Sequence, residues 1–216
     1  MSVISAAELL HGVLACLAPA RCAGCDGPCS DEAVCAAFCA GCEPLLDEPP
    51  ESLRPPAAAA AAYSYGGPLA DAIAKLKYGR RTELAPLLGQ LLAHAALPYA
   101  GLVDSVIPMP LFPRKLRARG FNQSALLGAY VARSLGVPLW TDRLHRVRDT
   151  AEQAGLTRHA RAANVRAAFV AQPLCERVLL LDDVRTTGAT LASGAEALCA
   201  AGAPAVITLA LAAAAR

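Results

Sequence analysis

The residues best suited to chemistry in this 216-residue chain follow an apolar run near its C-terminus. Arg177-Val-Leu-Leu-Leu-Asp-Asp-Val184 predicts a buried strand with two acids at its carboxyl end. Arg185-Thr-Thr-Gly-Ala-Thr190 comes next, and a helix is expected over residues 190–200. Threonine hydroxyls, a glycine that lets backbone N–H groups approach an anion, and a helix N-terminus together predict a phosphate site. The two carboxylates before the loop are placed to accept hydrogen bonds from a ribose diol.

Two common phosphate-binding loops are excluded. The Walker loop has the pattern Gly-x-x-x-x-Gly-Lys-Ser/Thr and the dinucleotide-binding loop has Gly-x-Gly-x-x-Gly, and neither pattern occurs. The remaining alternative is an ordinary helix entry with threonine caps and exposed loop acids. Two adjacent acids, three threonines and a glycine directly after a buried strand favour the phosphate site. The candidate binding residues are Asp182, Asp183, Arg185, Thr186, Thr187, Gly188, Ala189 and Thr190. Arg185 could reach a phosphate or point outward, so no specific role follows for it.

Two Cys-Ala-Gly-Cys motifs near the N-terminus have thirteen residues between Cys25 and Cys39. Four thiolates at this spacing can close a tetrahedral zinc site, formed by Cys22, Cys25, Cys39 and Cys42. A redox pair is the alternative. A small segment with so few aliphatic residues needs a cross-link in order to fold, which favours structural zinc. Cys29 and Cys35 lie between the motifs, where either could replace a ligand or stay free. The cysteines expected to be small core residues are Cys16, Cys175 and Cys199.

Charge is unevenly divided along the chain. Residues 1–50 contain one basic and seven acidic side chains, whereas residues 108–166 contain eleven basic and three acidic ones. The acidic module would repel a phosphate backbone, so we expect it to contact the basic face of the same chain or a protein. The middle of the chain favours an anion, and its densest basic cluster is Arg114, Lys115, Arg117 and Arg119. This cluster could bind pyrophosphate or DNA phosphate, or it could be a solvated basic loop.

Strand and helix patterns alternate after a proline-rich segment. A strand is expected over residues 103–108 and another over 205–212, with helices over 68–77, 82–96 and 122–135. Such alternation predicts a parallel sheet covered by helices, with ligands at the carboxyl ends of its strands. The Pro- and Ala-rich linker at residues 49–60 separates an N-terminal helix and zinc ribbon, 1–48, from the main domain, 61–216.

Nothing in the chain predicts a membrane segment or a secretion signal. No apolar run approaches the roughly 20 residues that a spanning helix needs. The N-terminus has no basic region before its apolar stretch, which Glu8 and His11 interrupt. We therefore expect a cytoplasmic protein without membrane insertion, whose thiols stay reduced.

Together these motifs resemble the ComF (ComFC) family, the competence-associated branch of the type I phosphoribosyltransferases. The likeness covers the four-cysteine module and the stretch from Asp182 to Thr190. It also covers, in order, Leu76-Lys-Tyr-Gly79, Pro108-Met-Pro-Leu-Phe-Pro-Arg-Lys-Leu-Arg-Ala-Arg-Gly-Phe-Asn-Gln123, Gln153-Ala-Gly-Leu156 and Asn164-Val-Arg-Ala-Ala-Phe169. The resemblance implies an α/β fold like that of type I phosphoribosyltransferases, a parallel sheet flanked by helices, with a small N-terminal zinc ribbon.

The resemblance also implies a ligand, phosphoribosyl pyrophosphate with Mg²⁺. Asp182 and Asp183 would hold the ribose hydroxyls, and residues 186–190 the 5′-phosphate. The Mg²⁺ ion would sit on pyrophosphate and ribose oxygens, since it favours phosphates over an all-protein cage. Positioned Arg and Lys side chains would stabilise the leaving pyrophosphate.

Two functions remain open at this level. One is a phosphoribosyltransferase with an unidentified acceptor, for which neither His145 nor His159 is a convincing general base. The other is a non-catalytic factor in natural transformation that binds single-stranded DNA, a competence helicase or other DNA-uptake proteins. Few aromatic residues are available for base stacking beyond Tyr78, Phe112 and Phe121. DNA binding is therefore expected to be weak and strongly dependent on salt.

Overall fold

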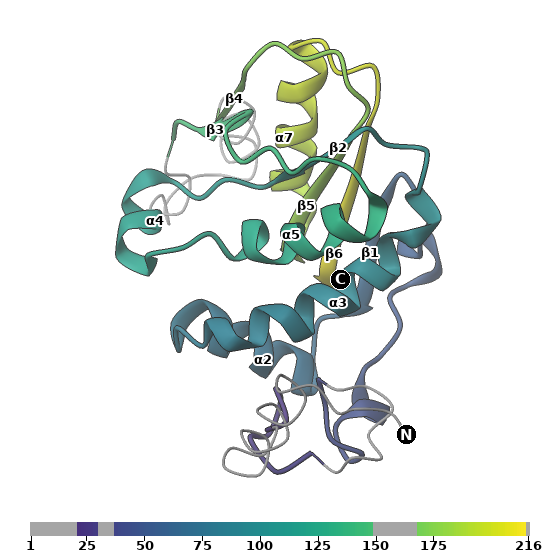
Figure 1. Ribbon diagram of the computed structural model, residues 1–216, viewed down its shortest axis with the longest axis vertical. Helices are drawn as coiled ribbons and strands as arrows, with labels where there is room; N and C mark the ends of the chain where they lie inside the picture. Colours follow the sequence, from purple (N-terminus) through teal and green to yellow (C-terminus); the bar gives the residue numbers. More distant parts are fainter. Residues whose placement is uncertain (1–20, 30–36, 149–167, 215–216) are drawn as a thin grey trace, which may run out of the picture.

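The structure is a computed structural model that describes residues 21–29, 37–148 and 168–214. The Gln153-Ala-Gly-Leu156 motif and most of Asn164-Val-Arg-Ala-Ala-Phe169 lie outside the described residues, as do Cys16, Cys35 and His159. The core is a four-stranded parallel sheet in the order β1-β6-β5-β2 (Figure 1). Its strands are β1 (Ala59–Ser64), β2 (Ser105–Pro108), β5 (Val178–Arg185) and β6 (Val206–Ala213). The expected parallel α/β fold with helices on its faces is confirmed.

Strand β5 occupies an interior position because its residues are apolar on both faces. It pairs in parallel with β2 through Ile107 opposite Leu180, and with β6 through Leu181 opposite Leu209. Leu179 and Leu181 join the cluster beneath α3 (Ala85–Ala96) and α5 (Gln123–Leu135). Val178 and Leu180 join the cluster beneath α7 (Ala189–Ala200) on the other face. Each fully buried leucine contributes about 1.5–3 kcal/mol relative to an exposed one, so this packing fixes where β5 ends.

The helices follow the predicted ranges closely. Helix α2 spans Gly67–Tyr78, and the stretch expected as one helix over 82–96 begins as a 3₁₀ turn, Thr82–Leu84, before α3. Helix α5 begins after Asn122, whose side chain accepts a hydrogen bond from the Ser124 N–H at 3.0 Å, and it ends at Gly136 with φ of 67°. Helices α3 and α5 approach closely at Gly89, where a Cβ atom would lie 2.5 Å from the Tyr130 ring.

Strand β1, one helix and two short strands were not predicted. The basic cluster forms helix α4 (Pro113–Arg119), which begins with a proline and ends at Gly120 in the left-handed region, φ 87°. A separate antiparallel pair joins β3 (Leu144–Arg146) and β4 (Phe169–Ala171). Short 3₁₀ turns complete the described elements at Glu43–Leu45, Glu51–Leu53 and Leu97–Tyr99.

The cysteine-rich segment packs directly on the main domain. Cys22, Ala23 and Phe38 are buried in the same apolar cluster as Leu69 and Leu76 of α2. A Cβ atom on Gly24 would lie 2.5 Å from Pro68 in the first turn of α2, so the cysteine turn needs glycine there. The end of the alanine-rich segment, which we expected as linker, enters β1 at Ala59. Within the described residues, no helix has the length and apolar character needed to cross a membrane.

Candidate functional site

The two aspartates lie at the carboxyl end of β5 and are held by side chains from two helices. Asp182 Oδ1 accepts hydrogen bonds from Ser124 Oγ of α5 and from the Asp183 N–H, both at 2.9 Å. Asp183 is only 3% exposed, and its Oδ2 forms an ion pair at 2.5 Å with Lys77 Nζ in the last turn of α2. Both partners of this pair are largely buried, with 5% and 17% of their side chains exposed. The carboxylates are therefore fixed in position by the fold.

These aspartates line a cavity of about 200 Å³, here called the carboxylate cavity. Its lining includes Met109, Pro110 and Leu111, which follow β2, and the polar residues Lys77, Gln123, Arg146, Asp182, Asp183 and Thr190. The polar side chains thus come from α2, α5, β3, β5 and α7. This convergence at the carboxyl ends of β2 and β5 is the usual position of a ligand site in an open α/β sheet.

Burial, and then the adjacent negative charge of Asp183, raises the pKa of Asp182 to about 8. Hydrogen bonds from the Asp183 N–H and the Ser124 hydroxyl act in the opposite direction but do not offset these effects. At neutral pH the Asp182 carboxyl therefore holds a proton in most molecules. A polar ligand that donates hydrogen bonds, or a cation, would favour its ionised form.

The loop after the aspartates leads into the N-terminus of α7. Gly188 adopts a left-handed conformation with φ of 81° immediately before Ala189. The Arg185 guanidinium folds over this glycine, because a Cβ atom there would meet its Nε at 2.9 Å. Thr187 Oγ1 accepts a hydrogen bond from the Ala189 N–H at 3.3 Å, and the Thr186 and Thr187 side chains are exposed. Of the predicted loop residues, Thr190 reaches the carboxylate cavity.

The end of α2 and Arg80 just after it contact the basic helix α4. Arg80 donates a hydrogen bond to the Ala118 carbonyl of α4 at 3.1 Å, and the Arg119 guanidinium lies 5.5 Å from the Tyr78 ring centre. Arg119 also donates to Oε1 of Gln123, which lines the carboxylate cavity. No α4 side chain is itself among the described residues that line that cavity, so the predicted cluster Arg114, Lys115, Arg117 and Arg119 borders the site rather than filling it.

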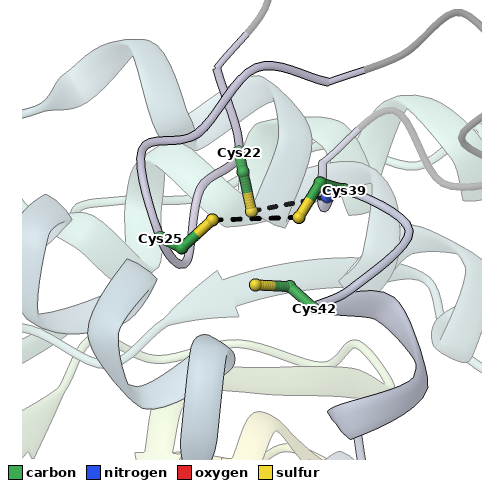
Figure 2. A group of neighbouring side chains, drawn as sticks. All are labelled: Cys22, Cys25, Cys39 and Cys42. Atoms are coloured by element: carbon green, nitrogen blue, oxygen red, sulfur yellow. Dashed lines mark hydrogen bonds between the residues drawn. The ribbon is translucent and has the colours of Figure 1, made fainter.

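The four predicted cysteines gather into one cluster (Figure 2). Their sulfur atoms all lie within 4.8 Å of one another, and Cys25 and Cys39 are separated by 3.8 Å. That distance is far too long for a disulfide, which is about 2.05 Å. Four sulfurs bound tetrahedrally at about 2.3 Å from zinc would be about 3.8 Å apart. The cluster can therefore hold a metal ion such as zinc, and Cys29 is not part of it.

Electrostatics within the cluster also suits a cation. Burial opposes ionisation of Cys22, but hydrogen bonds from the backbone N–H groups of Cys25, Cys39 and Gly24 lower its thiol pKa to about 6. Burial and the neighbouring sulfurs raise the pKa of Cys42 to about 12. Sulfurs this close cannot all ionise without a positive charge between them. Outside the cluster, Cys175 and Cys199 are exposed, so the prediction that they are core residues was wrong.

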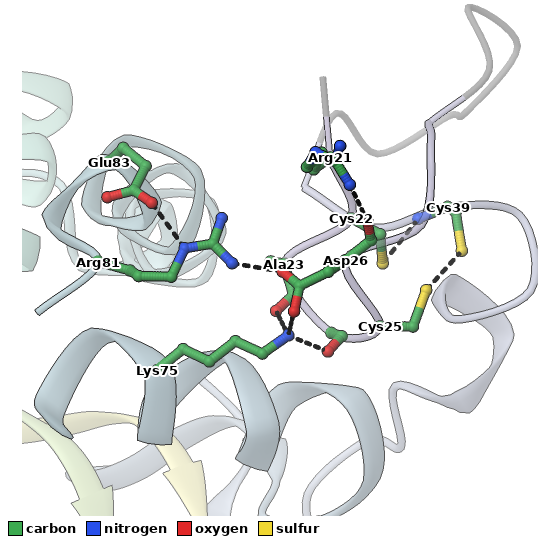
Figure 3. Close-up of polar contacts among 10 residues, drawn as sticks. Arg21, Cys22, Ala23, Cys25, Asp26, Cys39, Lys75, Arg81 and Glu83 are labelled. Carbon is green, nitrogen blue, oxygen red and sulfur yellow. Dashed lines mark hydrogen bonds and ion pairs between the residues drawn. The ribbon is translucent and has the colours of Figure 1, made fainter. Parts of the chain in front are cut away.

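An acidic residue of the cysteine module joins it to basic residues of the main domain (Figure 3). Lys75 Nζ lies 2.7 Å from Asp26 Oδ2 and donates hydrogen bonds to the carbonyls of Ala23 at 3.3 Å and Gly24 at 2.5 Å. Arg81 pairs with Asp26 as well. The acidic module thus contacts the same chain, but through basic residues that lie outside the predicted basic block, 108–166. The contact involves α2, the helix that also carries Lys77.

Several site residues had no role predicted for them. Lys77 belongs to Leu76-Lys-Tyr-Gly79 and Gln123 ends Arg119-Gly-Phe-Asn-Gln123, so both lie in motifs that carried the family resemblance. Ser124 and Arg146 lay in no such motif. A basic residue two positions before the glycine that ends a helix gives no indication of its partner. Only the tertiary structure brings Lys77 to Asp183.

Comparison with known proteins gives consistent results. The chain is 37% identical over 149 residues to DNA utilization protein YhgH of Escherichia coli (strain K12), covering 66% of each chain. It is 39% identical over 95 residues to competence protein F of Haemophilus influenzae, covering 42% of each. No family model matches. With its sequence motifs and four-cysteine cluster, the chain belongs to the ComF family.

Solved structures give a more distant likeness. The glutamine phosphoribosylpyrophosphate amidotransferase of B. subtilis complexed with ADP and GMP is 22% identical, with a TM-score of 0.38 over 57% of this chain and 25% of that one. The structure of an allosteric regulatory enzyme of purine biosynthesis is also 22% identical, with a TM-score of 0.40 over 57% and 24%. At these scores the overlap is partial; the fold is defined by the parallel strand order β1-β6-β5-β2, with β5 inside the sheet.

Proposed function

We propose that this protein binds phosphoribosyl pyrophosphate together with Mg²⁺ at the carboxyl end of β5. The observation that carries the proposal is the pair Asp182 and Asp183, held by Ser124 and Lys77 directly before the loop that opens α7. The carboxylates accept hydrogen bonds from the two ribose hydroxyls. The 5′-phosphate lies on the backbone N–H groups of residues 186–190 at the positive end of α7.

The chemistry that follows is transfer of the phosphoribosyl group to an acceptor. Bound with the ligand, Mg²⁺ would supply positive charge to the leaving pyrophosphate. Arg185 lies against Gly188, and a contact of its guanidinium with the phosphate is part of the proposal. The basic residues of α4, whose last arginine contacts Gln123, favour the developing negative charge on the leaving group. The ribose hydroxyls and the paired aspartates keep the sugar in one orientation.

The cysteine cluster is proposed to hold zinc as a structural ion. Four thiolates and no open position are typical of structural rather than catalytic zinc. The reduced thiols that such a site needs agree with a cytoplasmic location. The zinc module packs on α2, and it thereby supports the helix that provides Lys77.

Calorimetry with phosphoribosyl pyrophosphate and Mg²⁺ tests the proposal. Zinc-loaded wild type should bind in the micromolar range, and Asp182→Asn/Asp183→Asn should lose binding by at least a hundredfold. Asp104→Asn is a control, because Asp104 pairs with exposed Arg177 at the opposite end of β5. Absence of binding to folded wild type, or equal binding by the double variant, would contradict the proposal.

A second candidate function is binding of single-stranded DNA or of DNA-uptake proteins such as a helicase. The observation that favours it is Tyr78, which is 78% exposed and whose ring centre lies 5.5 Å from the Arg119 guanidinium, where Arg80 contacts α4. An exposed ring beside cations is the arrangement on which bases stack. A labelled oligonucleotide should bind Tyr78→Ala more weakly than wild type, and its affinity should fall steeply with salt. An unchanged affinity in Tyr78→Ala would reject this role for the surface.

A further inference from the structure

A second, larger hollow opens directly beside the carboxylate cavity. Its volume is about 670 Å³, within the range of small-molecule sites, and it lies between α4, the start of α5 and β3. The two share three lining residues, Pro110, Leu111 and Arg146, so they adjoin at that point. We call the larger hollow the basic groove.

The lining of the basic groove combines apolar surface with positive charge. Its apolar part includes Phe112, Leu116, Leu144 and Val147. Its charged or ionisable side chains are Arg117, His145 and Arg146, and none of the described residues that line it is acidic. The apolar residues favour a flat ring, and guanidinium groups bind carboxylates through paired hydrogen bonds. This lining selects a ligand that is both aromatic and anionic.

Arg146 is held in a defined place at the junction of the two hollows. Its Nε donates a hydrogen bond to the Arg148 carbonyl at 3.3 Å, and its guanidinium lies 5.6 Å from the centre of the Phe169 ring. Strand β3, which carries it, is paired with β4. A guanidinium fixed in this way loses little freedom when a ligand binds. Arg146 lines both the carboxylate cavity, to which the ribose is assigned, and the basic groove.

We propose that the basic groove binds the acceptor, and that the acceptor is a small planar aromatic molecule with a carboxylate and a nucleophilic nitrogen. This inference rests on the proposed function, because the groove adjoins the cavity assigned to the ribose. A nitrogen of the acceptor donates its electron pair to C1 of the ribose. The bond from C1 to pyrophosphate breaks with its pair on the leaving oxygen. Where the attacking nitrogen carries a proton, as in orotate, that proton passes to solvent; a ring nitrogen without one, as in nicotinate, becomes quaternary.

Matched pairs of probe molecules test the class of acceptor. Each pair shares a ring but differs in its acid: orotate with uracil, and nicotinate with nicotinamide. Binding is measured by saturation-transfer NMR and calorimetry at saturating phosphoribosyl pyrophosphate and Mg²⁺, and release of pyrophosphate is followed in parallel. The wild type should prefer the carboxylate member of at least one pair by tenfold or more.

Two variants locate the binding. Arg117→Gln and Arg146→Gln should each reduce the carboxylate preference at least fivefold, measured at saturating phosphoribosyl pyrophosphate for each variant. Arg133→Gln is the control, since Arg133 lies on α5 and lines a separate hollow, and it should keep the preference. Failure of phosphoribosyl pyrophosphate to bind wild type would refute the proposed function itself. Normal binding with no carboxylate preference in either pair, or a preference that survives both variants, would overturn the assignment of the groove alone.

Discussion

Protonation of Asp182 should control how tightly phosphoribosyl pyrophosphate binds as pH changes. Burial, and then the charge of Asp183, raises the pKa of this carboxyl to about 8 in the free protein. A protonated carboxyl has lost part of the acceptor capacity that a ribose diol requires. The ligand therefore binds the ionised form, and binding at neutral pH releases a proton.

The size of the effect follows from the titration of one group. With a pKa near 8, about a tenth of the molecules are ionised at pH 7 and about nine tenths at pH 9. Affinity should thus rise roughly tenfold over this interval, and proton release should fall from about 0.9 to about 0.1 per ligand. The second phosphate ionisation, at a pKa of about 6, is nearly complete at pH 7 and contributes little.

Calorimetry in two buffers with different ionisation enthalpies measures both quantities. Asp182→Asn is the control, because an amide cannot titrate and its weaker binding should be nearly constant from pH 7 to pH 9. A wild-type affinity that stays constant or decreases over this interval, or binding at pH 7 without proton release, would refute the reasoning.

Three further predictions concern stability. Lys77→Met should destabilise the fold by about 3–5 kcal/mol in urea unfolding, because it leaves Asp183 buried without its ion pair. The double variant Lys77→Met/Asp183→Leu should recover most of that loss. Equal losses in the single and double variants would show that the ion pair is not responsible. The pKa of Asp182 is raised in the folded state. Its contribution to the free energy of unfolding is therefore complete below about pH 4 and is lost as pH rises to about 8. Unliganded wild type should therefore lose stability relative to Asp182→Asn across that window, and parallel curves for the two proteins would contradict this. Gly89→Ala should reduce the stability of the fold by about 1–3 kcal/mol, because the new Cβ atom meets the Tyr130 ring. The control Gly66→Ala should reduce stability by less than about 1 kcal/mol, because no atom lies within 4 Å of its new Cβ. Equal melting temperatures of the two variants would show that α3 and α5 adjust freely.

The sequence was sufficient to predict the elements that have a single local cause. Strand β5 is a continuous apolar run followed by acids, and α5 has an asparagine at its start and a glycine at its end. Such signals act through residues close together in the chain, so the predicted ranges agree with the structure within a few positions. The cysteine cluster was equally predictable, because metal-ligand spacing is itself a local property.

The remaining features depend on contacts between distant segments. Helix α4 had its proline and glycine signals in the sequence, but its high charge suggested a loop. The strands β3 and β4 are three residues each, too short to show an alternating pattern. The partner of Asp183 is over a hundred residues earlier in the chain, on α2. Lys77, Gln123 and Arg146 therefore join the site only through packing.

A crystal structure of the zinc-loaded protein with Mg²⁺ and phosphoribosyl pyrophosphate tests the central claim most directly. The ribose hydroxyls should lie within hydrogen-bonding distance of Asp182 and Asp183, with the 5′-phosphate on the backbone N–H groups of residues 186–190. A ligand bound elsewhere on the protein, or a carboxylate cavity without ligand at saturating concentration, would contradict the claim.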